Sequence, residues 1–185
     1  MLGGSFDPPH IGHVILAQEV LWQLDLDEVL LVPCLRSPHK PEGHRFDAEL
    51  RLQMVEAAIE GHAGLAASRA ELDREPPSFT VETLRRLSDE EPDTQLWLLV
   101  GADQLHALAS WRDPEVILQL ARIAAVDRGP ATDLPEGLHA SRVDRVSMPR
   151  IDVSSTDIRR RLDAGAPVWH LVPPGVTELL EATRA

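Results

Sequence analysis

The sequence predicts a three-layer α/β fold, in which a doubly wound parallel sheet is flanked by helices on both faces. Short apolar runs that read as strands alternate with segments whose apolar residues recur at helical spacing. The richest runs are apolar on consecutive residues, as expected where helices cover both faces of a sheet. Alternation of strands and helices is typical of parallel sheets.

The individual elements follow from these patterns. The runs predicted as strands are 28–33, 65–68, 95–100, 123–127 and 145–148. One predicted helix carries the apolar stripe Val14, Ala17, Leu21 and Leu24, and another carries Ala48, Leu52, Val55 and Ile59. Asp47 is the expected N-cap of the second helix. Loops rich in Pro and Gly are expected at 33–45, 73–78 and 128–137. In a Rossmann-like sheet of this kind, ligands bind beyond the carboxyl ends of the strands.

Composition narrows the class of protein. A chain of 185 residues, 43% of them hydrophobic, fits one domain over residues 1–185. Its single cysteine, Cys34, excludes an internal disulfide and a Cys-based zinc cluster and is interpreted as a small apolar residue near a strand end. No apolar run is long enough to cross a membrane, so a cytoplasmic protein without membrane contact is expected. The net charge of −12 disfavours nucleic acid as a partner.

The first cluster of candidate site residues runs from Gly3 to His13. Two glycines allow close approach of the backbone to a ligand, and a helix is expected to begin near Ile11. His10 and His13 are three residues apart and can share a face of its first turn. A helix start with two imidazoles indicates a phosphate site, although two histidines that merely hydrogen-bond within a turn would give the same spacing.

A second cluster follows the strand at 145–148. Ser154 can cap a helix, with Asp157 three residues further on. Arg159 then lies in the first turn, where the helix dipole disfavours a cation unless an anion is shared. The alternative is a solvated arginine in the Arg-rich run 159–161. Together the two clusters predict that a polyphosphate is held between two helix starts.

Specific motifs strengthen this interpretation. The segment His10-Ile11-Gly12-His13 is similar to the HIGH signature of nucleotidyltransferases, and the Ser-Ser-Thr-x-Ile-Arg segment at 154–159 resembles their second signature. The whole chain resembles bacterial nicotinate-nucleotide adenylyltransferases. Further matching segments are 38–40, 78–84, 101–103, 110–111, Arg128 and 171–173. The chain departs from the family at the first strand, where only Met1 and Leu2 precede the glycines, and at Ser5, Phe79 and His170.

The resemblance implies adenylyl transfer from ATP to nicotinate mononucleotide, giving deamido-NAD and pyrophosphate in NAD biosynthesis. It implies a catalytic role for His10, His13, Lys40 (the only lysine) and Arg159. The ATP contacts that it implies are Gly4, Ser5, Phe6, His39, Gly101, Asp103, Ser154, Ser155 and Thr156. Mg²⁺ would be carried on the ATP phosphates, and no metal ligands can be named among the residues.

The mononucleotide would contact Gly3, Asp7, Thr80, Trp111, Arg112 and Arg128. The acid is expected to be preferred over the amide, because the Thr80 hydroxyl and the backbone N–H after Trp111 would donate to the pyridine carboxylate. Several of these residues have plain structural alternatives. Asp103 could be a helix cap, Lys40 a surface lysine, and Trp111 a packing residue. A homo-oligomer is compatible with the sequence.

Three other functions share part of the pattern. Phosphopantetheine adenylyltransferases carry both signatures, but usually have threonine where His10 stands and lack the Ser110-Trp111 region. Class I aminoacyl-tRNA synthetases have HIGH, but this chain is short, acidic and without a KMSKS-like segment. A non-catalytic nucleotide sensor would be expected to have lost His13, Lys40 or Arg159, which are all present.

Overall fold

The computed structural model describes residues 1–36, 43–127, 134 and 138–183, and for Ala102 and Asp103 it describes the backbone alone. The strands of this part of the chain are β1 (Leu2–Gly4), β2 (Val29–Pro33), β3 (Leu65–Ala67), β4 (Leu96–Gly101), β5 (Ala121–Asp127) and β6 (Val143–Ser147). The helices are α1 (Ile11–Gln23), α2 (Ala48–Ile59), α3 (Thr80–Glu90), α4 (Ala102–Ala107), α5 (Pro114–Leu120), α6 (Ser155–Asp163) and α7 (Pro174–Ala182). Short 3₁₀ turns cover Leu108–Ser110 and Ala140–Arg142. The predicted strands and helices are confirmed.

The described strands form two parallel ladders, ordered β1-β2-β3 and β4-β5-β6. The ladders meet at Met1, whose backbone nitrogen donates to the Trp97 carbonyl at 2.6 Å and whose carbonyl accepts from the Leu99 N–H at 2.9 Å. The combined order 3-2-1-4-5-6 is that of a doubly wound sheet with a reversal between β1 and β4. Strands β1 and β4 remain neighbours, but no ladder joins them among the described residues. They part in the sense that the backbone hydrogen bonds between them stop at Met1.

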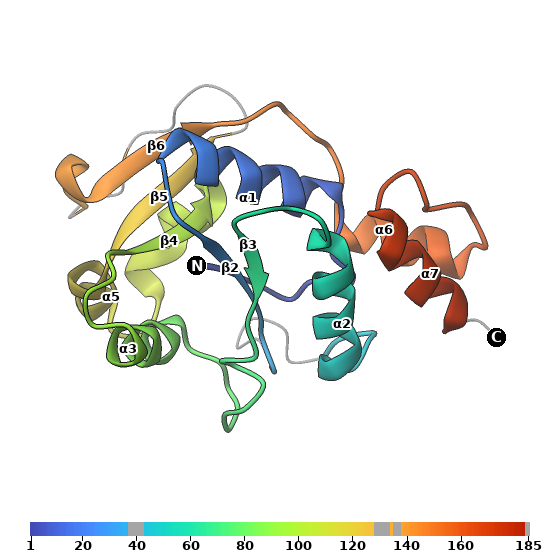
Figure 1. The fold of residues 1–185 in the computed structure, drawn as a ribbon, viewed down its shortest axis with the longest axis horizontal. Coiled ribbons are helices and arrows are strands. Elements are labelled where there is room, and N and C mark those ends of the chain that lie inside the picture. The colour runs from blue at the N-terminus through green and yellow to red at the C-terminus, as the bar shows by residue number, and fades with distance from the viewer. Residues whose placement is uncertain (37–42, 128–133, 135–137, 184–185) are drawn as a thin grey trace.

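Helices cover both faces of the strands, which confirms the three-layer prediction (Figure 1). Helices α1 and α2 pack on one face through Leu16, Val20 and Val55. Helices α3 and α5 lie side by side on the other face, where Leu84 and Ile117 join the core. The residues of β2, of β5 and of Leu98–Val100 in β4 are nearly all buried, which explains the consecutive apolar runs in the sequence.

A third apolar cluster holds the C-terminal helices. Ile158 of α6 and Val176 of α7 pack against Met54 of α2, and Figure 1 shows α6 and α7 at the end of the molecule next to α2. This packing fixes where α6 begins. Ser154 caps that helix and accepts from the Asp157 N–H at 3.1 Å, as Asp47 caps α2 by accepting from the Leu50 N–H at 2.8 Å. Both predicted caps are confirmed.

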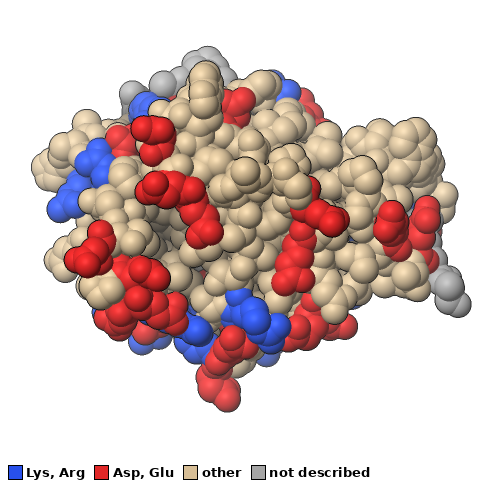
Figure 2. All heavy atoms as spheres, in the orientation of Figure 1, with Lys and Arg blue, Asp and Glu red and all other residues tan. Residues whose placement is uncertain are grey.

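The surface is acidic, in keeping with the net charge of −12. Figure 2 shows carboxylate side chains scattered over one whole face of the molecule, with basic side chains among them at its edges. Within the described residues, no helix has both the length and the apolar character needed to span a bilayer. The cationic groups that could hold an anion must therefore be sought locally.

Candidate active site

A cavity of about 700 Å³ opens where β1 and β4 part, and we call it the central cavity. Its walls come from the carboxyl ends of these strands, the beginnings of α1 and α3, and the turn after residue 110. It therefore lies at the reversal point of the strand order, where a doubly wound sheet is expected to bind its ligand. The predicted site residues that line it are Gly3, Gly4, Ser5, His13, Thr80, Gly101, Trp111 and Arg112.

The first signature forms the turn between β1 and α1. His10 is the N-cap of α1, and its backbone N–H donates to Nδ1 of His13 at 3.1 Å. The two imidazole rings stack with their centroids 3.7 Å apart, as expected from their spacing. Because Nδ1 of His13 accepts this bond, the proton of the neutral ring must be on Nε2. His13, which lines the central cavity, is thus fixed as an Nε2–H donor.

The second signature reaches across to the first. The Ser155 hydroxyl donates to the Pro8 carbonyl at 2.8 Å, and Arg159 Nη1 donates to the Asp7 carbonyl at 2.7 Å. The other guanidinium nitrogen of Arg159 donates to the Thr156 hydroxyl at 3.2 Å. The starts of α1 and α6 are therefore neighbours, as the sequence predicted. Ser154, Ser155, Thr156 and Arg159 do not themselves line the central cavity; they flank the turn that does.

Two predicted ligand contacts are better explained as internal supports. The Asp7 carboxylate is 3% exposed and accepts from the backbone N–H groups of Arg45 and Phe46, each at 3.0 Å. It ties the chain before α2 to the first signature and does not line the central cavity. The Phe6 side chain is buried in the core below the sheet, at a positive φ of 45°. Its ring would lie 3.1 Å from a Cβ at Gly4, which explains the glycine there.

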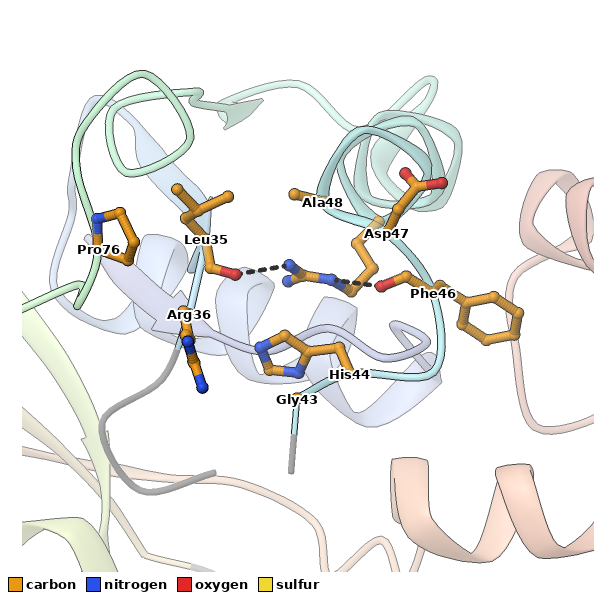
Figure 3. A pocket seen from close by; sticks show the side chains of 9 residues that line it. Leu35, Arg36, Gly43, His44, Phe46, Asp47, Ala48 and Pro76 are labelled. Carbon is orange, nitrogen blue, oxygen red and sulfur yellow. Dashed lines mark hydrogen bonds between the residues drawn. The ribbon is translucent and has the colours of Figure 1, made fainter. Parts of the chain in front are cut away.

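Arg51 is a supporting residue that the sequence did not reveal. It is 1% exposed, and its guanidinium donates to the carbonyls of Ser5 and Cys34, each at 2.7 Å, and of Phe46 at 3.2 Å. A longer bond of 3.4 Å reaches Leu35. Figure 3 shows the bonds to Leu35 and Phe46 at the wall of a second cavity of about 450 Å³. A buried arginine bonded to the β1–α1 connection and to both ends of the β2–α2 connection fixes their relative positions. Its only sequence mark is a charge between Leu50 and Leu52.

Trp111, Arg112 and Phe79 form the far wall of the central cavity. Trp111 packs against the α3–α5 core, and its buried Nε1 has no hydrogen-bond partner among the residues that the structure describes. The Arg112 guanidinium lies 4.7 Å from the centroid of the Phe79 ring. Phe79 is also the N-cap of α3, which begins at Thr80. The rings of Phe79 and Trp111, the guanidinium of Arg112 and the start of α3 thus lie at one wall of the cavity.

Glu71 is an unpredicted acidic residue in the lining of the central cavity. It is 5% exposed, and Oε1 accepts from the Thr83 hydroxyl at 2.7 Å. Burial raises the pKa of this carboxyl, while hydrogen bonds from Thr83 and Ser78 and the charge of Arg74 pull it back. Cys34 also lines the cavity and is buried, and it lies at the end of β2, as predicted.

Some predicted residues fall outside what the structure describes. His39, Lys40 and Arg128 lie in the segments 37–42 and 128–133, and the Asp103 side chain is likewise outside the description. Gly101 ends β4 and is the N-cap of α4, so the backbone at Asp103 is in the first turn of that helix. Sequence reasoning alone supports the roles of these four residues.

The chain is similar to known proteins in both sequence and structure. A profile described as cytidylyltransferase-like matches residues 1–161. The probable nicotinate-nucleotide adenylyltransferase of Leifsonia xyli subsp. xyli is 41% identical over 181 residues, covering 97% of this chain and 89% of the relative. The protein of the same name from Exiguobacterium sibiricum is 39% identical over 182 residues, covering 98% of this chain and 94% of the relative. The chain belongs to the nicotinate-nucleotide adenylyltransferase family.

This assignment confirms the resemblance inferred from the two signatures, and it makes the chain a member of a family of nucleotidyltransferase enzymes. Among solved structures, Plasmodium falciparum nicotinic acid mononucleotide adenylyltransferase complexed with NaAD has a TM-score of 0.77 at 15% identity, covering 99% of this chain and 94% of that one. At such low identity this likeness establishes the α/β architecture alone. The matched part of this nicotinate-nucleotide adenylyltransferase family member includes both signatures and the residues that line the central cavity.

Proposed function

We propose that this chain transfers the adenylyl group of ATP to nicotinate mononucleotide. A phosphate oxygen of the mononucleotide bonds to the α-phosphorus of ATP, and the bond from that phosphorus to the oxygen shared with the β-phosphate breaks. Pyrophosphate leaves with the electron pair of that bond, and deamido-NAD remains. One observation carries the proposal: Ser155 and Arg159 bond to the turn that holds His13, beside a cavity that continues to Trp111.

The chemistry suits this set of residues. A phosphate monoester is already mostly dianionic at neutral pH, since its second pKa is about 6, so it needs no general base and no covalent nucleophile. Two anions must instead be aligned, and the charge that builds on pyrophosphate must be stabilised. Donors fixed in advance do this best. His13, held as an Nε2–H donor by the bond from His10, is such a group.

On the ATP side, we assign the triphosphate to His10, His13 and Arg159, with Lys40 and His39 approaching from the segment between β2 and α2. The backbone of Gly4 to Phe6 and the hydroxyls of Ser154, Ser155 and Thr156 would supply further donors at the two helix starts. Gly101 and Asp103 would contact the ribose and the base. The hydroxyl of Ser155 and the guanidinium of Arg159 are already oriented toward the first signature by their bonds to it.

On the mononucleotide side, we propose that the pyridine ring stacks on Trp111 and that Thr80 and Arg112 lie near the carboxylate of the ring. Gly3 would contact the mononucleotide through its backbone, and Arg128 would bind the phosphate of the mononucleotide. Trp111 lines the central cavity, which supports stacking of the pyridine ring at this wall. The Plasmodium protein of the same fold is complexed with NaAD, a ligand that combines both halves of the site proposed here.

We treat magnesium as part of the substrate. Mg²⁺ is usually bound through substrate phosphates and one or two carboxylates. In the described part of the chain, no group of three or more His, Cys, Asp or Glu side chains forms a metal cage. No protein ligand and no separate metal-dependent step is therefore assigned. We further propose that residues 1–185 act as one nucleotidyltransferase domain in the cytoplasm.

A substrate panel tests the proposed function. Purified protein with Mg²⁺ and ATP is given nicotinate mononucleotide, nicotinamide mononucleotide or phosphopantetheine, and pyrophosphate release is followed. We expect the highest kcat/KM with nicotinate mononucleotide. Turnover confined to phosphopantetheine would move the chain to the coenzyme A pathway, and ATP binding without any turnover would make it a nucleotide sensor.

A further inference from the structure

Arg112 lies at the wall of the central cavity and forms no ion pair with any residue that the structure describes. Its guanidinium stacks over Phe79 at 4.7 Å, a cation–π distance. Among the described residues, no carboxylate lies within 4.0 Å of Arg112, although the chain has a net charge of −12. The adjacent carboxylate, Asp113, lies 3.8 Å from Arg85 instead. Within the described part of the chain, the charge of Arg112 is thus not paired with a carboxylate.

The neighbouring groups favour an anion at the same wall. Helix α3 spans 11 residues from Thr80, and its N-cap Phe79 provides no side-chain cap. The N–H groups of its first turn therefore carry the positive end of the helix dipole. The acidic residue of the cavity lining, Glu71, is bonded to the Thr83 hydroxyl.

We propose that the Arg112 side chain determines specificity by charge: its guanidinium attracts the carboxylate of the nicotinate ring and gives no such advantage to the nicotinamide ring. This inference rests on the proposed function and adds to it. The Thr80 hydroxyl and a backbone N–H can donate to either the acid or the carbonyl of the amide, so they discriminate weakly. A cation separates the two substrates because only one of them is charged at that position.

The expected kinetic effect follows from where the charge lies. The ring carboxylate keeps its charge throughout the reaction, so its attraction to Arg112 is the same in the bound substrate and in the transition state. Loss of such an interaction raises KM and leaves kcat nearly constant. A hydrogen bond to a charged group, weakened by partial exposure of Arg112, corresponds to about tenfold in kcat/KM.

The experiment compares wild type with R112Q, R112K and the control R85Q. Arg85 is a neighbouring arginine that pairs with Glu82 and does not line the cavity. The ratio of kcat/KM for nicotinate over nicotinamide mononucleotide is measured at low and high ionic strength. We expect the ratio to fall about tenfold in R112Q through KM, to be largely kept in R112K, and to be unchanged in R85Q. Added salt should lower the ratio in wild type and hardly affect it in R112Q.

The outcomes separate this inference from the proposed function. An R112Q protein that keeps the wild-type ratio overturns the inference, and so does an equal loss with both mononucleotides. If R112Q does not fold, a salt-independent ratio in wild type overturns it as well. Failure of wild type to use nicotinate mononucleotide at all would instead remove the proposed function.

Discussion

Replacing Arg51 with methionine should destabilise the protein strongly although the residue contacts no substrate. Methionine preserves much of the apolar stem but removes every donor, so the carbonyls of Ser5, Cys34 and Phe46 lose their bonds from the guanidinium. A buried acceptor left without its donor costs about 1–3 kcal/mol. We take the lower end, because the variant also avoids the cost of burying a cation.

Three such acceptors give a loss of about 3 kcal/mol in the free energy of unfolding. For a chain of 185 residues this corresponds to a fall in Tm of roughly 10 °C. Urea unfolding followed by circular dichroism measures the difference. Activity should fall as well, because Ser5 belongs to the turn that holds the first signature.

The matched control is Arg69→Met. Arg69 forms a two-bond ion pair with Glu49 on the surface, and exposed pairs contribute little to stability. An Arg51→Met protein that unfolds at the same urea concentration as Arg69→Met would refute the view that the buried guanidinium holds the β1–α1 and β2–α2 connections together.

Three further variants test the site. His13→Ala should lower kcat on the order of a hundredfold or more while leaving the thermal midpoint close to wild type; near-normal turnover would remove its assigned role. Glu71→Gln should flatten the pH dependence of stability. Because burial raises the folded-state pKa of Glu71, wild type is expected to lose stability as pH rises through that pKa, and parallel unfolding curves for both proteins from acid to neutral pH would contradict this. Thr80→Ala should lower kcat/KM for both mononucleotides and change the preference for nicotinate less than R112Q does, because a hydroxyl can donate to the acid and to the amide alike; a preference lost in Thr80→Ala and kept in R112Q would assign it to the hydroxyl instead.

Local patterns allowed the sequence to predict much of the fold. The apolar runs indicated strands because these strands are covered by helices on both faces. Asp47 and Ser154 indicated helix starts because a cap side chain bonds to a backbone N–H only three residues further on. The first and second signatures could be placed together because the carboxyl ends of parallel strands share an edge. The stacking of His10 on His13 followed from their spacing.

Long-range bonds were beyond such patterns. Asp7 binds backbone groups at Arg45 and Phe46, 38 and 39 residues away in the chain, and Arg51 reaches Ser5 across 46 residues. The family resemblance implied a ligand contact for Asp7, whereas its carboxylate oxygens accept hydrogen bonds from the protein itself. No periodicity or motif encodes which distant carbonyl an arginine will meet, so these supports appear only in three dimensions.

The parting of β1 and β4 has a consequence for how the protein responds to its ligands. The strand pairs of one ladder carry the signature turn, and the chain segments beyond the other ladder carry Trp111 and Arg112. Backbone bonds between the ladders are confined to Met1. A dinucleotide in the central cavity would occupy the space that further rungs of an unbroken sheet would fill. A bound dinucleotide would hold the two ladders together, and its binding free energy would add to the free energy needed to separate them.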